Sequence, residues 1–215
     1  MLFRSSETAA AVITAHDAIF NALEGVGGGI GAGAVKLVLS GGTLTAQGPF
    51  INVEGGGGPL PVASLDAHAG AIQIVVRDTG REDDSIVLGP ASYISANGGF
   101  VMLNLGDSPS IADGAWIQAT DFIEVDIDAA SLDPDPGIGA TLAYSDTVFR
   151  FNGSEYVVHV TTGADDDTIT VPGVANDSLR IDINTGAGND RLLMGGPATA
   201  DEWGRINLWA GDGED

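Results

Sequence analysis

The stretch Thr185-Gly186-Ala187-Gly188-Asn189-Asp190-Arg191-Leu192 is a glycine-rich turn that ends in an acid and an apolar residue. The same turn recurs at residues 79–86, 162–169 and 210–215. In every copy an Asp lies four residues after the aligned glycine, and an apolar residue lies six after it in the three copies that extend that far. This fixed spacing indicates a structural repeat. The aligned pairs are Gly80 and Asp84, Gly163 and Asp167, Gly186 and Asp190, and Gly211 and Asp215.

Apolar residues alternate with other residues in the stretches that lead into the turns, which is typical of β-strands with one buried face. The turns themselves lie near residues 42, 80, 106, 130, 163, 186 and 211, and four of the six gaps between them are 23–26 residues long. A period of this length is typical of solenoid proteins, in which each repeat stacks on its neighbours. The alternating stretches are 35–39, 72–76, 101–105, 123–127, 156–160, 179–183 and 206–208.

We therefore predict an all-β fold, a right-handed parallel β-helix or β-roll-like solenoid with coils of about 24 residues. Stacked coils would place equivalent residues about 4.8 Å apart along the axis. The alternative is an antiparallel β-sandwich, which also contains many short strands. We favour the solenoid, because a sandwich does not require the same side chains at the same turn of every repeat.

Three segments are expected along the chain. Residues 1–33 form an N-terminal segment with a short helix at 6–23, predicted from one apolar face, and a glycine-rich connector. Residues 34–155 form the β-solenoid, with a loop insertion and a hairpin insertion at 147–156, where Asn-Gly separates two strand-like stretches. Residues 156–215 hold the regular Gly–Asp turns.

Both ends of the chain look incomplete. Residues 1–5 can be encoded by the end of a common sequencing-library adapter read in frame, so we treat them as candidates for non-native residues. Asp215 ends the chain inside a turn, before the expected apolar residue. We therefore expect this chain to be a fragment of a larger protein.

Charge and composition exclude several classes of function. The 215 residues include 30 acids and 8 bases, for a net charge of −22, which repels nucleic acid and anionic membranes and attracts cations. There is no cysteine, so disulfides and thiolate metal sites are absent, and there is no apolar run of the roughly 18 residues that a membrane span needs. His16, His68 and His159 share no metal-ligand spacing, and no Gly-x-Ser-x-Gly motif is present. We predict that the chain is not an enzyme.

The turn at 185–192 resembles the nonapeptide Gly-Gly-x-Gly-x-Asp-x-apolar-x of haemolysin-type (RTX) calcium-binding repeats, with Thr185 in place of the first glycine. The resemblance covers residues 156–215 and the copy near residue 80. It implies that Ca²⁺ lies between stacked turns, bound by backbone carbonyls and by the Asp of each motif. The residues nominated in this way are Asp84, Asp165, Asp167, Asp190, Asp212 and Asp215, with Gly163, Gly186, Gly188 and Gly211.

The sequence also departs from that family. It has one motif per coil of about 24 residues, where the family has tandem nonapeptides, and Asp165 replaces the third glycine of its copy. Stacked carboxylates about 5 Å apart repel one another by roughly 3 kcal/mol at an effective dielectric constant near 20, which favours a bound cation. The other interpretation is that each Asp only caps its turn through side-chain hydrogen bonds.

These features predict a structural, calcium-binding segment of a large secreted or cell-surface bacterial protein, such as a stalk or adhesin. The expected partners are calcium ions and cell-surface glycans or proteins, without nucleic acid or a membrane span. One alternative is a polysaccharide-active β-helix lyase or hydrolase, which an acid cluster on a side face away from the turns would favour. Another is a metal-free acidic solenoid from a salt-loving organism.

Overall fold

The computed structural model describes residues 12–22, 26, 34–56, 58–77, 79, 83–128, 139–144, 148–153, 156–171, 179–195 and 205–215. Over these residues the fold is all-β, and every strand pairing is parallel. This confirms the predicted all-β class and shows that the antiparallel sandwich is wrong. Within the described residues there is no helix with the length and hydropathy of a membrane span.

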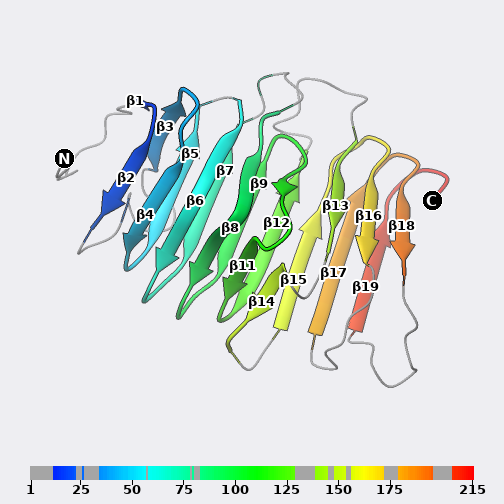
Figure 1. Ribbon diagram of the computed structural model, residues 1–215. Helices are drawn as coiled ribbons and strands as arrows, with labels where there is room; N and C mark the ends of the chain where they lie inside the picture. Colours follow the sequence, from blue (N-terminus) through cyan, green and yellow to red (C-terminus); the bar gives the residue numbers. More distant parts are fainter. Residues whose placement is uncertain are drawn as a thin grey trace.

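The strands of the described residues form three sheets, which lie along one long axis with β1 and β19 at opposite ends (Figure 1). The nine-stranded sheet has the order β1 (Val12–Ala15), β3 (Val35–Leu39), β5 (Ile51–Gly55), β7 (Ile72–Val76), β9 (Val101–Leu105), β12 (Phe122–Ile127), β15 (Tyr156–Thr161), β17 (Leu179–Gly186) and β19 (Arg205–Ala210). The seven-stranded sheet contains β14 (Phe149–Phe151), β11 (Trp116–Ala119), β8 (Ile86–Ala96), β6 (Leu60–Ala67), β4 (Leu44–Gly48) and β2 (Ala18–Asn21), with β10 (Ser110–Ile111) paired to β8. The three-stranded sheet contains β13 (Thr141–Ala143), β16 (Thr168–Val171) and β18 (Arg191–Met194).

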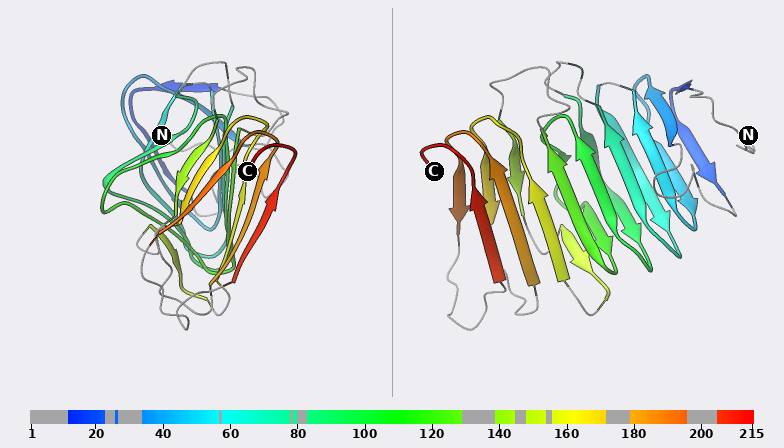
Figure 2. Two further views of the ribbon diagram at one scale, coloured as in Figure 1. Left: turned by 90° about the vertical axis from the view of Figure 1, so that its right-hand side faces the viewer. Right: turned by 180° about the vertical axis from the view of Figure 1, so that it is seen from behind.

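The chain passes from one sheet to another after nearly every strand. Odd-numbered strands from β1 to β9 belong to the nine-stranded sheet, and the even-numbered strands between them belong to the seven-stranded sheet. Toward the C-terminus, the three-stranded sheet takes the place of the seven-stranded one on the same side of the molecule (Figure 1). Figure 2 shows the nine-stranded sheet from its outer face in the right-hand view, with its strands side by side.

The core lies between the sheets and is built from in-register apolar rows. Val125 of β12 pairs with Val160 of β15, which pairs with Ile183 of β17, and all three side chains are buried. Burying an aliphatic side chain of this size contributes about 1.5–3 kcal/mol, so the register is fixed by the apolar alternation. The residues between the buried ones point outward along the same strands, as the sequence period predicts.

Two predicted elements are wrong. The helix predicted at 6–23 is replaced, over its described part, by strands β1 and β2, because pairing with β3 and β4 outweighs a weak local helical pattern. Ile19, one of the apolar residues within the predicted helix, is 68% exposed, while Ala18 beside it is buried. The hairpin predicted at 147–156 is also absent, since β14 pairs with β11 and β15 pairs with β12 in a different sheet.

Candidate metal centre at the stacked turns

The three C-terminal Gly–Asp turns lie directly beside one another. The backbone N–H of Asp167 donates to Oδ1 of Asp190 at 3.0 Å, and the N–H of Asp190 donates to Oδ1 of Asp215 at 3.2 Å. Arg191 N–H donates to the Asp167 carbonyl at 2.8 Å. Asp190 and Asp215 therefore each cap the main chain of the equivalent Asp in the preceding turn, which explains the fixed four-residue spacing from the glycine.

The aligned glycines allow this close approach. A Cβ built on Gly186 would lie 1.8 Å from the carbonyl oxygen of Gly163, and one on Gly211 would lie 1.4 Å from the carbonyl oxygen of Gly186. A Cβ on Gly188 would lie 2.2 Å from the Asp165 carbonyl oxygen and 3.1 Å from Oδ1 of Asp190. Backbone carbonyl oxygens of one turn thus face the glycines of the next, and any larger residue would force the turns apart.

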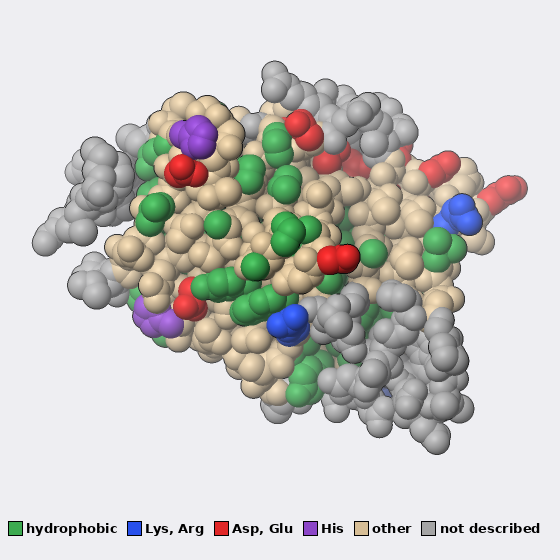
Figure 3. Space-filling view, in the orientation of Figure 1, with side chains coloured by type: hydrophobic (Ala, Val, Ile, Leu, Met, Phe, Trp, Pro, Cys, Tyr) green, Lys and Arg blue, Asp and Glu red, His purple; other side chains and the backbone are tan. Residues whose placement is uncertain are grey.

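The hydrogen bonds that join Asp167, Asp190 and Asp215 form one ladder between the turns. A second ladder of hydrogen bonds runs along the exposed side of the same turns. Asn189 donates to Oδ1 of Asp166 through its backbone N–H at 2.8 Å and its side-chain amide at 3.1 Å. The N–H of Glu214 in turn donates to Oδ1 of Asn189 at 3.1 Å. These three side chains, each directly before the acid of its turn, are exposed. Figure 3 shows acidic side chains along the upper edge of the molecule, where these turns lie.

Asp167 is buried, with 1% of its surface exposed. Its Oδ1 accepts a hydrogen bond from Ala140 N–H at 2.6 Å, and its Oδ2 accepts one from the Thr162 hydroxyl. Burial raises the pKa of Asp167 to about 6, and the neighbouring charges of Asp190 and Asp165 add to the increase against those hydrogen bonds. The hydrogen bonds therefore satisfy the oxygens of Asp167 without fully offsetting the cost of its charge.

Asp190 occupies the same position one turn later but lacks the equivalent threonine bond. Its Oδ2 is buried without a hydrogen-bond partner, and so is the hydroxyl oxygen of Thr185, the counterpart of Thr162. Oδ2 of Asp165 is likewise buried and unpartnered. In the described part of the chain, no Lys, Arg or His forms an ion pair with Asp165, Asp167 or Asp190. Three acids thus share a buried region without a protein cation.

The earlier copy of the turn stands apart from the C-terminal three. Asp84 is fully buried, and its carboxylate accepts hydrogen bonds from Gly58 N–H and from the N–H and hydroxyl of Thr79. Its own N–H donates to Oδ2 of Asp107 at 2.6 Å, so the ladder continues there into a coil that lacks the Gly–Asp spacing. Both Asp84 oxygens are satisfied within the protein. Sequence reasoning missed Asp107, whose only signal is an acid that directly follows the Gly106 turn.

The two remaining nominated acids are at the exposed end of the stack. Asp215 is exposed and accepts the Asp190 N–H, and the backbone carbonyl of the exposed Asp212 accepts a hydrogen bond from Gly188 N–H at 3.2 Å. The structure therefore brings together the acids of the three C-terminal turns and separates Asp84 from them.

The oxygen-rich turns fit a hard cation better than a soft one. Within the described residues, no group of three or more His, Cys, Asp or Glu side chains is arranged so that it could hold a metal ion. Ca²⁺ takes six to eight oxygens, including backbone carbonyls and water. The unpartnered oxygens of Asp165, Asp190 and Thr185, beside carbonyls that face the next turn, match this chemistry.

Comparison of the chain with protein-family models, with curated proteins and with solved structures finds no match. The interpretation of the turns therefore depends on their own residues and geometry.

Proposed function

We propose that this chain is a structural segment of a secreted or cell-surface protein, in which the coils form a right-handed parallel β-helix and Ca²⁺ stabilises the stacked turns. The observation that carries the proposal is the buried, unpartnered Oδ2 of Asp190, together with that of Asp165, in turns whose carbonyls face one another. An unpaired buried polar group costs about 1–3 kcal/mol, and more when it is charged. A divalent cation would remove this cost at both carboxylates.

Each residue of the turn would have a distinct part in calcium binding. Asp165 and Asp190 would supply carboxylate oxygens, because each has one oxygen without a hydrogen bond. Asp167, whose two oxygens already accept hydrogen bonds, would contribute mainly its charge. The glycines keep the turns close enough for backbone carbonyls to complete the oxygen shell. Bound Ca²⁺ would supply positive charge that ties neighbouring coils together.

A weak extracellular site agrees with this arrangement. Few charged ligands and a share of neutral carbonyls are typical of modules with dissociation constants of about 10⁻⁴–10⁻³ M, which fill only where calcium is abundant. The elongated stack of coils in Figure 1 supports a spacer or stalk. Continuous buried rows along the axis would make such a stalk stiff.

The test is thermal unfolding with calcium or with EGTA. For one site with the affinities above, about 10 mM Ca²⁺ should add about 1.4–2.7 kcal/mol of stability. At about 2–4 °C per kcal/mol for a chain of this size, the melting temperature should rise by about 3–10 °C. We expect Asp190→Asn to lose this increment.

Asp166→Asn is the matched control, because it removes the same charge from an exposed side chain of the neighbouring turn. The Asp166→Asn variant should keep the rise in melting temperature that calcium causes. An unchanged melting temperature in EGTA would contradict the calcium proposal. If NaCl then raised the melting temperature where calcium did not, the metal-free acidic solenoid would be the better interpretation.

One observation favours the alternative of a polysaccharide-active enzyme. Glu124 and Asp126 lie on the outer face of β12, away from the stacked turns. Burial raises the pKa of both carboxyl groups, and the charge of Asp126 raises that of Glu124 further. A raised carboxyl pKa suits a general acid. Release of reducing ends from a neutral polysaccharide, abolished by Glu124→Gln, would establish this function, and its absence would count against it.

A further inference from the structure

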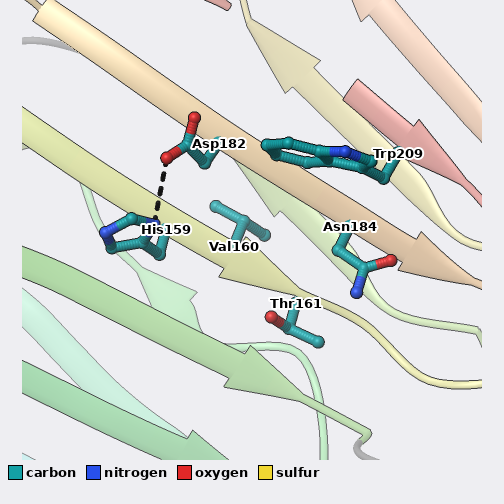
Figure 4. Close-up of a pocket in the computed structure, with 6 residues that line it drawn as sticks. All are labelled: His159, Val160, Thr161, Asp182, Asn184 and Trp209. Carbon is teal, nitrogen blue, oxygen red and sulfur yellow. Dashed lines mark ion pairs between the residues drawn. The ribbon is translucent and has the colours of Figure 1, made fainter. Parts of the chain in front are cut away.

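A shallow pocket of about 240 Å³ lies on the outer face of the nine-stranded sheet, at the strand ends that lead into the stacked turns. Figure 4 shows the side chains that surround it: the Trp209 indole ring extends over β17 toward Asp182, His159 closes the opposite side, and Thr161 and Asn184 border the rest. In-register pairing positions them, because Thr161 aligns with Asn184 and Asn184 aligns with Trp209 across β15, β17 and β19.

The floor and walls of the pocket have different chemistry. Val160 also lines it, but its side chain is buried in the core, so its main chain forms the floor. Trp209 is 53% exposed and presents a large planar apolar surface beside the polar side chains of the pocket. On the other side, Phe122 lies outside the pocket and contacts the His159 ring edge-on, with centroids 6.0 Å apart.

Asp182 is held rigidly at the edge of the pocket. Its carboxylate contacts Arg180 at 2.7 and 2.9 Å, the Asn207 amide at 2.6 Å and His159 Nδ1 at 3.3 Å. Burial opposes its ionisation, but the hydrogen bonds from Arg180 and Asn207 and the positive charges of Arg180 and His159 together hold the pKa of Asp182 below its usual value. These contacts occupy both oxygens of the buried carboxylate, so Asp182 fixes the side chains around the pocket and offers no free oxygen to a ligand.

The charges around the pocket select an uncharged ligand. A cation would compete with Arg180 and His159, which already neutralise Asp182. An anion would be repelled by the overall charge of −22 and by the acids Glu124 and Asp126, which lie on β12, the strand paired with β15. A flat ring with one apolar face and a rim of hydroxyl groups fits both the indole and the surrounding amide and hydroxyl groups.

We propose that the Trp209–Asp182–His159 pocket is a binding subsite for one uncharged pyranose ring of a glycan. The ring stacks its C–H face on the Trp209 indole, and its hydroxyl groups bond to Asn184 and Thr161. The inference does not depend on the calcium proposal.

The test is saturation-transfer NMR and titration of the 215-residue chain with neutral oligosaccharides of glucose, galactose, mannose and N-acetylglucosamine. An oligogalacturonate and choline serve as the anionic and cationic probes. We expect at least one neutral oligosaccharide to bind with a dissociation constant at or below about 10 mM, as for a single-ring subsite with few contacts. Trp209→Ala should weaken binding at least tenfold, and Asn184→Ala should weaken it less.

Leu208→Ala is the matched control, because Leu208 is the neighbouring exposed residue of β19 and its side chain points to the opposite face of the strand. It should change the affinity by less than twofold, and circular dichroism should show that all variants keep the β-sheet spectrum. Binding of none of the neutral oligosaccharides, binding of only choline or oligogalacturonate, or binding that survives Trp209→Ala would overturn the proposal. Repeating the titration in EGTA measures glycan binding without calcium, so failure of this proposal can be distinguished from failure of the calcium proposal.

Discussion

Replacing Gly186 with alanine tests the close stacking of the turns directly. Gly186 has φ +73°, and a Cβ there would lie 1.8 Å from the Gly163 carbonyl oxygen and 3.1 Å from that of Thr162. Both neighbours are backbone atoms, so the turns themselves must separate to admit the methyl group. That movement would stretch the hydrogen bond from Ala187 N–H to the Gly163 carbonyl, which is 3.3 Å in the native structure.

The expected loss of stability in the Gly186→Ala variant has two parts. A non-glycine residue in the left-handed region costs about 1–2 kcal/mol. Forcing extra atoms into a tightly packed contact adds about 1–3 kcal/mol. Gly186→Ala should therefore cost about 2–5 kcal/mol out of a total stability of about 5–15 kcal/mol.

Gly114 provides the control, because it has φ +87° and a Cβ there would meet nothing within 4 Å. Gly114→Ala should cost only the left-handed strain of about 1–2 kcal/mol. The measurement is urea unfolding followed by circular dichroism, in EGTA, with equal m-values as the condition for comparing the variants. If the two variants lose the same free energy within about 0.5 kcal/mol, the turns do not approach one another as described.

Two further predictions concern a buried charge and the aromatic core. Because the pKa of Asp167 is about 6 in the folded chain against an ordinary 3.8, the fold binds this proton more tightly than the unfolded chain does. In EGTA the free energy of unfolding should therefore fall by up to about 3 kcal/mol as the pH rises from 4 to 6 and then level off, and Asp167→Asn should remove this part of the pH profile. If the stabilities of the wild type and of Asp167→Asn changed with pH in the same way, the raised pKa would not belong to Asp167. Phe149 is buried and stacks on Tyr144 with ring centroids 5.4 Å apart, so Phe149→Ala should cost about 3–5 kcal/mol in urea unfolding, and a loss under 1 kcal/mol would be inconsistent with this packing.

The sequence predicts the strands because their apolar alternation continues without interruption. The stretches at 101–105, 123–127 and 179–183 fall within β9, β12 and β17, and their apolar residues are buried in matching rows. Parallel pairing agrees with the repeat, because in-register parallel strands place the equivalent turns beside one another. The helix prediction failed where this support is weakest, at residues 12–21, because a few apolar residues fit two periods and only pairing with β3 and β4 decides between them.

The sequence predicts which turns stack but not what each oxygen contacts. Asp84 and Asp167 share the Gly–Asp spacing with Asp190, and a threonine hydroxyl bonds to each of the first two. At Asp190 the same threonine is present at position 185, yet the bond is not formed. The distinction depends on small displacements between coils, which local sequence does not encode. The Trp209 pocket was missed for a similar reason, because its side chains meet only through the register of three strands.

The two ladders of the turns separate the role of the hydrogen bond from the role of the charge. In the exposed ladder, the amide oxygen of Asn189 accepts the backbone N–H of Glu214, so an uncharged side chain is sufficient to cap the neighbouring turn. In the buried ladder the equivalent oxygen belongs to Asp190, which is only 6% exposed and has a second oxygen without a partner. Asn at that position would keep the bond to Asp167 N–H and would avoid burying a charge. Hydrogen bonding alone therefore does not account for the acid, and the proposed cation would give its second oxygen a partner. In EGTA, Asp190→Asn should therefore be at least as stable as the wild type. In calcium, the variant should be less stable than the wild type. If the variant is destabilised equally in both conditions, the carboxylate is needed only for the fold.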